Sequence, residues 1–193
     1  MKFLTSISIV AFSLIACASS LKDAPETVDS VDLERYQGKW YEIVKIPNNF
    51  QEDCVSDVTA EYSSAEDGLL KVVNSCVREN GKAKSSEGRA RIEDPVTNAR
   101  LKVTFAKMFG KWIFAFGGDY WIIELAEDYS TVVVGHPQRK FGWILSRTPA
   151  LNTATLKELS ERLVSQGYNP CEFISGKQSG GLHREVSLCE LVE

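Results

Sequence analysis

The sequence has few of the residues and motifs on which metal sites and many catalytic sites depend. It holds two histidines and no Cys-x-x-Cys pair, so a structural metal centre is not expected. His136 lies beside Pro137 in a predicted turn, and His183 lies near the end of the chain. No serine and aspartate are placed to form a triad with either histidine, and no glycine-rich loop of the phosphate-binding kind occurs. These absences argue against a metal, a cofactor or a hydrolytic triad.

Charge of one sign is not concentrated in any part of the chain. The 22 basic and 26 acidic residues are interspersed and leave a net charge of −4. Because no basic stripe is present, nucleic acid is not an expected partner. Internal repeats and low-complexity segments are also missing. The length of 193 residues suits one domain, or one domain that follows a processed leader.

Long hydrophobic runs are missing too, apart from one at the start of the chain. The run from Phe3 to Ala16 follows Lys2; it is short for a membrane span but has the length and flank of a signal peptide. It ends in LIAC, which resembles the bacterial lipoprotein box. The resemblance implies that residues 1–16 are a lipoprotein signal peptide and that Cys17 receives fatty acyl chains such as palmitate. The alternative is an ordinary signal peptide with an incidental cysteine.

Residues 17–31 are expected to carry the anchor and a polar tether that lifts the domain off a membrane. Several acyl chains on Cys17 would anchor firmly, because a single chain gives only marginal binding. The next residues are Ala18 and Ser19 rather than aspartate, which resembles the outer-membrane lipoproteins of enteric bacteria. The implied location is the periplasmic face of a bacterial outer membrane.

Apart from the predicted anchor, the chain has four cysteines. An even number in an exported protein favours disulfides, and four cysteines allow three connectivities. A hairpin that sets Val58 opposite Val72 also sets Cys54 opposite Cys76, close to disulfide range. The alternative joins Cys54 or Cys76 to the C-terminal segment. The predicted pairs are Cys54–Cys76 and, by remainder, Cys171–Cys189.

From Gly38 onward the chain reads as a series of strands. Apolar and polar residues alternate, and turn residues recur about every ten positions, as in antiparallel strands. Eight or nine strands without intervening helices predict a meander, and closing it into a barrel removes both sheet edges. The predicted fold is all-β, an eight-stranded antiparallel up-and-down β-barrel. The expected strands cover residues 39–46, 55–63, 69–78, 84–92, 101–105, 112–116, 120–125, 131–135 and 142–147.

The aromatic segment 107–118 has two interpretations. It is either a strand buried in the barrel wall or a segment that presents side chains at the open end of the barrel, against a membrane or a partner. The side chains so presented would be Met108, Phe109 and Trp112.

One C-terminal segment changes from strand to helix spacing. An amphipathic α-helix of about three turns is predicted there, and it is expected to pack outside the barrel. Thr155 and Glu158 form a capping-box pattern at its start, and Gly167 follows as a stop. Residues 176–193 are expected to form a tail closed by the second disulfide. The apolar face of the helix carries Leu156, Leu159 and Leu163.

Three motifs together resemble the lipocalin family. Gly38-Lys39-Trp40 matches the family's G-x-W opening, and Arg147 stands where its last-strand arginine lies. Asp128-Tyr129 is similar to its T-D-Y turn, with Glu127 where threonine is usual. Phrases such as GKWYEI and WILSRTP are typical of the bacterial subgroup. The resemblance implies that residues 32–175 form a lipocalin barrel with its helix.

The resemblance also implies structural roles for these motifs. In the family the tryptophan closes one end of the barrel, and the arginine lies across its indole. Trp40 is therefore expected to plug the barrel floor, with Arg147 stacked on it as a cation–π pair. Gly38 is expected to let the entering chain turn closely beneath the floor, and Asp128-Tyr129 to form a turn.

An eight-stranded barrel is wide enough either to fill with side chains or to hold one small ligand. Because strand side chains alternate between faces, an inward Trp40 also turns Glu42 and Val44 inward. The expected interior is apolar and aromatic with a few polar groups, which suits an acyl chain whose polar head lies near the open end. The predicted ligand-binding residues are Glu42, Val44, Val58, Ala60, Val72, Asn74, Val103, Phe105, Tyr120, Ile122 and Trp143.

The resemblance implies a protein that binds a fatty acid, lysophospholipid or phospholipid, for storage or transport in envelope maintenance, and that is not an enzyme. Two alternatives stay open. One is a thiol-dependent lipid-modifying enzyme, which requires Cys54 and Cys76 as free thiols. The other is a protein with a filled barrel that works through its surface. The oligomeric state is also open, a dimer included.

Overall fold

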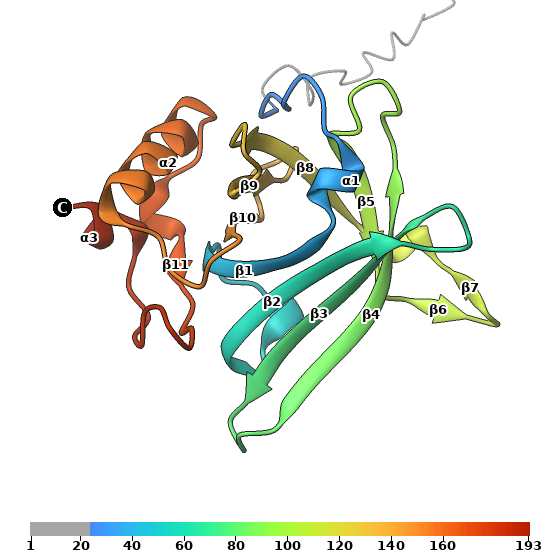
Figure 1. Cartoon of the computed structure of the whole chain (residues 1–193), viewed down its shortest axis with the longest axis horizontal. Coiled ribbons are helices and arrows are strands. Elements are labelled where there is room, and N and C mark those ends of the chain that lie inside the picture. Colours follow the sequence, from blue (N-terminus) through green and yellow to red (C-terminus); the bar gives the residue numbers. More distant parts are fainter. Residues whose placement is uncertain (1–23) are drawn as a thin grey trace, which may run out of the picture.

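The structure is a computed structural model, which describes residues 24–193. The predicted signal peptide and the predicted anchor Cys17 lie outside the described residues. Eight antiparallel strands form a sheet that closes on itself where β10 pairs with β1 (Figure 1). The predicted eight-stranded barrel is therefore confirmed. Its strands are β1 (Gly38–Lys45), β2 (Cys54–Ser64), β3 (Leu70–Arg78), β4 (Ala83–Ile92), β5 (Arg100–Thr104), β8 (Gly118–Leu125), β9 (Thr131–Gly135) and β10 (Gly142–Ser146).

Short elements surround the barrel. A helix of 13 residues, α2 (Thr153–Ser165), lies beside the barrel together with α3 (Leu188–Val192) (Figure 1). A two-residue strand, β11 (Ile174–Ser175), pairs with the end of β1. The remaining elements are α1 (Leu33–Tyr36), η1 (Asn49–Gln51), β6 (Lys107–Met108), β7 (Lys111–Trp112), η2 (Phe114–Phe116) and η3 (Pro170–Glu172).

The strand predicted over residues 112–116 is wrong. Strands β6 and β7 pair only with each other, and residues 114–116 form the single turn η2. The backbone reverses at Phe109 and Gly110, which both have positive φ, so the segment folds into a separate hairpin. Phe109 is 97% exposed. The alternative interpretation holds for Met108 and Phe109, which are exposed, but Trp112 is half-buried.

The register of β2 and β3 also differs from the prediction. Val72 lies opposite Tyr62 rather than Val58, and two bulges near the start of β2 shift the pairing again towards Cys54. Cys54 therefore lies opposite Arg78 rather than Cys76. The disulfide nevertheless joins Cys54 to Cys76, with 5.7 Å between their Cα atoms. The second predicted pair is also a disulfide, Cys171–Cys189.

Helix α2 begins one turn away from the predicted cap. Its N-cap is Asn152, whose side chain accepts a hydrogen bond from the Thr155 backbone N at 2.9 Å. Asparagine is among the best N-cap residues, so the capping box predicted from Thr155 is wrong. Leu156, Leu159 and Leu163 are buried as expected.

Two apolar cores lie on opposite faces of the sheet. One fills the inside of the barrel around Trp40 and Ile122. The other lies between the outer face of the sheet and the C-terminal helices, and includes Ile43 and Leu163. Among the described residues, no helix combines the length and the apolar character needed to cross a membrane.

Part of the expected tether packs against the barrel. The Val28 backbone N donates to the Ile122 carbonyl at 3.0 Å, and the Val31 backbone N donates to the Thr97 carbonyl at 2.7 Å. Val31 is buried in the inner core. The chain is therefore held against the closed end of the barrel from about Val28 onward.

Candidate ligand-binding site

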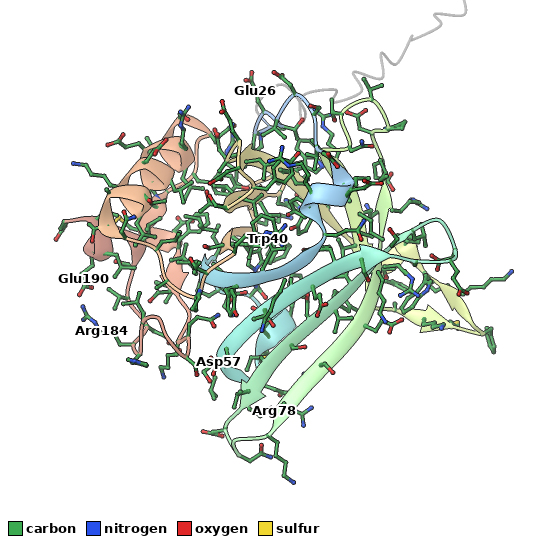
Figure 2. All side chains as sticks on the ribbon, in the orientation of Figure 1. Glu26, Trp40, Asp57, Arg78, Arg184 and Glu190 are labelled. Atoms are coloured by element: carbon green, nitrogen blue, oxygen red, sulfur yellow. A yellow bond between two sulfur atoms is a disulfide. The ribbon has the colours of Figure 1, made fainter. Side chains whose placement is uncertain are left out.

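The barrel floor is built around Trp40, which Figure 2 places deep among the packed side chains. The side chain is fully buried, and its Nε1 donates to the Tyr36 carbonyl at 2.9 Å. The guanidinium carbon of Arg147 lies 3.7 Å from the indole centroid. The same guanidinium donates to the carbonyls of Lys39 at 3.0 Å and Arg35 at 2.8 Å. Arg147 thus ties the end of β10 to α1 and β1.

Gly38 and the Asp128-Tyr129 turn also lie next to Arg147. Gly38 has φ +90°, and a Cβ atom built on it would lie 3.3 Å from Arg147 Nη1, so this position favours glycine twice over. In the turn after β8, Asp128 Oδ1 accepts from the Ser130 backbone N at 2.9 Å. The Tyr129 carbonyl accepts from Arg147 Nε at 3.3 Å. All three sequence motifs therefore converge on one closed end.

Beyond this floor the barrel holds a cavity of about 400 Å³. Its wall is mostly apolar and comes from both halves of the sheet. Phe50, Phe105 and Phe116 line the cavity and are also 64%, 43% and 73% exposed; these three side chains form the cavity opening. The predicted residues that line the cavity are Glu42, Val58, Ala60, Val72, Asn74, Val103, Phe105, Tyr120 and Trp143.

The other two predicted residues, Val44 and Ile122, do not line the cavity. A bulge between Glu42 and Val44 changes the register of β1, so Val44 packs in the outer core beside Ile43. Ile122 faces inward but lies in the floor core with Trp40. Alternation predicts the face of a strand residue, but it carries no information on depth along the barrel axis.

Sequence reasoning missed several lining residues. Phe50, Gln51 and Phe141 come from connecting segments, where no periodic pattern indicates a direction. Tyr62 lies on β2 two positions after Ala60, so extending the alternation along that strand would have found it.

Within residues 24–193, Glu42 is the one buried carboxylate in the wall, with 3% of its surface exposed. Its Oε2 accepts from Gln51 Nε2 at 3.0 Å, and its Oε1 lies 3.1 Å from Lys45 Nζ without a hydrogen-bond geometry. Burial raises the pKa of Glu42, and the charge of Lys45 and the hydrogen bond from Gln51 oppose that rise. Lys45 Nζ also donates to Gln51 Oε1 at 2.6 Å, so the three polar groups form one cluster.

A second polar cluster consists of three tyrosines at the junction of floor and cavity. The hydroxyl of Tyr120 lies 2.7 Å from that of Tyr36 and accepts from that of Tyr62 at 2.9 Å. Burial raises the pKa of Tyr62 to about 12 and raises the pKa of the other two well above 10.0. The three phenols therefore stay neutral and can only exchange hydrogen bonds.

Two buried oxygen atoms in the cavity wall have no hydrogen-bond partner among the described residues, Glu42 Oε1 and Asn74 Oδ1. A buried polar atom without a partner is costly. Both oxygens are covered by neighbouring side chains, so a molecule in the cavity reaches them only if those side chains shift. The site can therefore bury an apolar chain beside two polar groups that it does not satisfy itself.

The cystine Cys54–Cys76 also lines the cavity. Within residues 24–193 every cysteine belongs to a disulfide. A nucleophilic thiol requires a reduced cysteine, so the described part of the chain presents none to the cavity.

The chain is similar to known proteins of one family. A family model described as a lipocalin-like domain matches residues 31–178. The chain is 38% identical over 159 residues to "Temperature-induced lipocalin-1" of Arabidopsis thaliana. That alignment covers 82% of this chain and 85% of the relative. It is 35% identical over 179 residues to "Outer membrane lipoprotein Blc" of Escherichia coli K12. That alignment covers 92% of this chain and 97% of the relative.

Further relatives extend the comparison to animals. Apolipoprotein D of Bos taurus is 34% identical over 149 residues, which cover 73% of this chain and 74% of the relative. Among solved structures, insecticyanin of the tobacco hornworm Manduca sexta superposes with a TM-score of 0.63 at 24% identity. The match covers 81% of this chain and 84% of insecticyanin, and it supports the barrel fold alone.

Proposed function

Because the chain belongs to the lipocalin family, whose members bind small hydrophobic ligands, we propose that it binds a lipid with one acyl chain inside the barrel. The candidate ligands are a fatty acid, a lysophospholipid and a phospholipid. The function that follows is storage or transport of that lipid during maintenance of the cell envelope.

One observation carries this proposal, the apolar cavity of about 400 Å³ above a packed floor. Pockets that hold small organic molecules measure about 300–1,000 Å³ and combine apolar walls with a few polar groups. Each CH₂ group moved from water into such a wall contributes about 0.8 kcal/mol, before the costs of association are subtracted. This space also argues against the alternative of a filled barrel.

The polar atoms of the wall favour one kind of head group. Glu42 Oε1 and Asn74 Oδ1 lack hydrogen-bond partners among the described residues, and a ligand that shifts the side chains covering them would meet two acceptors. A lysophospholipid offers a glycerol hydroxyl as donor, whereas an ionised fatty acid offers only acceptors. We therefore expect lysophospholipids to bind more tightly than fatty acids of equal chain length at neutral pH.

We further propose that the protein acts at the periplasmic face of a bacterial outer membrane, held there by acylated Cys17. Relatives named outer membrane lipoprotein, such as the one from Escherichia coli, support the membrane. The Arabidopsis relative shows that the family also extends to plants. Mass spectrometry of the intact protein purified from membranes tests this step: the mass of residues 17–193 plus acyl groups is expected, and an unmodified Cys17 would contradict it.

A titration tests the cargo directly. The purified protein, stripped of lipid, is mixed with a fluorescent fatty acid, and unlabelled fatty acids and lysophospholipids then compete for the site. Saturable binding with displacement by lysophospholipid is expected. The absence of saturable binding for every amphiphile would refute the proposal.

The thiol-dependent enzyme remains a separate candidate only if its thiols are free. Titration of thiols in the unfolded, unreduced protein is expected to detect none from the four cysteines of residues 24–193, because all four are in disulfides. Two free thiols at Cys54 and Cys76 would favour the enzyme instead.

A further inference from the structure

The β6–β7 hairpin, residues 107–112, carries exposed apolar side chains at its tip. Phe109 is 97% exposed and Met108 is 52% exposed. Figure 1 shows the hairpin standing out from the barrel beside β4 and β5. Single exposed apolar residues are common, but a nearly bare phenylalanine beside an exposed methionine contributes nothing to either core. Burial within the chain therefore does not account for this tip.

Turn geometry does not account for the phenylalanine either. Phe109 and Gly110 both have positive φ, +49° and +79°, as in a type I′ two-residue turn. Asparagine or glycine is the usual residue at the first position of such a turn, and a bulky residue with positive φ is uncommon. Phe109 thus occupies a position where its backbone is strained and its ring is in water.

Basic side chains flank the tip. Lys107 and Lys111 stand on either side of it, and within residues 24–193 neither forms an ion pair with a carboxylate. Lys107 Nζ lies 4.9 Å from the ring centroid of Trp112, and the Arg89 guanidinium lies 4.9 Å from the same ring. Exposed aromatic rings between lysines are typical of segments that lie in the interface of an anionic lipid bilayer.

The hairpin is continuous with the cavity opening. Phe105 and Ala106 precede it and line the cavity, as do Phe116 and Gly118 after it. Because Phe105 and Phe116 are themselves exposed, apolar surface extends from the hairpin towards the opening.

We propose that the β6–β7 hairpin docks the protein onto the surface of an anionic lipid bilayer. Phe109 and Met108 enter the acyl-chain boundary, and Lys107 and Lys111 meet the anionic head groups. This contact is distinct from an anchor at Cys17, and it does not depend on which molecule the cavity binds. Docking would bring the cavity opening close to the bilayer.

Hydrogen exchange of the full-length protein tests this contact locally. Exchange of residues 105–118 is measured with vesicles of phosphatidylglycerol and phosphatidylcholine, with vesicles of phosphatidylcholine alone, and without vesicles. Exchange at the hairpin is expected to slow with anionic vesicles only, while the exposed turn between β3 and β4 is unaffected. An unchanged hairpin, or equal slowing with neutral vesicles, would overturn the proposal.

A variant pair separates docking from folding and from any anchor. Phe109→Asn removes the ring but suits the turn, so its melting temperature is expected to be no lower than that of the wild type, and the slowing by vesicles to be lost. The matched control is Val96→Asn, which removes an 87% exposed apolar side chain from the β4–β5 loop and should leave the slowing intact. Slowing that survives Phe109→Asn, or that appears without vesicles as protein concentration rises, would contradict docking.

Discussion

At the residue scale, Arg147 and Glu42 define the two ends of the barrel interior. Arg147 combines a cation–π contact with several hydrogen bonds to backbone carbonyls at the closed end. Glu42 is a buried acid in the cavity wall, with one oxygen that lacks a hydrogen bond. Arg147 stabilises the floor, and Glu42 leaves one carboxylate oxygen without a hydrogen bond in the cavity wall.

Arg147→Lys is expected to lower the free energy of unfolding by about 2 kcal/mol, although the positive charge is kept. A lysine cannot present the planar fork that reaches several carbonyls while it stacks on an indole. Urea unfolding measures the change, with Arg162→Lys on the exposed face of α2 as the control. Equal stabilities of the two variants would show that the floor does not depend on the guanidinium.

Glu42 makes stability depend on pH. Burial raises the pKa of Glu42 in the folded state above its ordinary value of 4.5. The folded state therefore holds the Glu42 proton more tightly than the unfolded state does. Stability contributed by this group is therefore full below about pH 4.5 and is lost as the pH rises through the folded pKa. Glu42→Gln removes the titration, so the stability of the variant relative to wild type should rise with pH. Urea unfolding from about pH 4 to about pH 8 tests this, and parallel curves would contradict it.

At the element scale, the sequence predicts most strands and the helix but not their exact registers. Alternation and turn residues locate all eight barrel strands, because most have one buried face, and β9, which is buried on both faces, is a run of β-branched residues between turns. Bulges in β1 and β2 insert extra residues that alternation cannot indicate, and they displace Val44 and the pairing around Cys54. The hairpin at 107–112 was open to two interpretations because apolar residues on an exposed segment look like a buried strand. Phe50 and Phe141 reach the cavity from segments without any period.

The N-cap of α2 is Asn152 in the structure, whereas the sequence pattern predicted Thr155. Asn152→Ala is expected to lower the free energy of unfolding by about 1 kcal/mol, because it removes the hydrogen bond to the Thr155 backbone N. Thr155→Ala should have little effect, since its side chain does not cap the helix. Thermal or urea unfolding of the two variants decides between the caps, and the reverse order of stabilities would restore Thr155 as the cap.

At the scale of the whole molecule, the barrel is packed at one end and partly empty at the other. Trp40 and the inner core fill the closed end, and the disulfide Cys54–Cys76 lies in the wall of the empty end. The outer core holds the C-terminal segment against the outer face of the sheet, and the second disulfide joins η3 to α3 within that segment.

The most direct test of this account compares lysophospholipid binding by the wild type, Ala60→Trp and Val164→Trp. Ala60 lines the cavity, so an indole there fills space that the ligand needs, whereas Val164 is 59% exposed on α2. Saturable binding of a fluorescent fatty acid, and with it displacement by lysophospholipid, is expected to be lost for Ala60→Trp and unchanged for Val164→Trp, with both variants folded by circular dichroism. Equal affinity in all three proteins would show that the lipid does not bind inside the barrel.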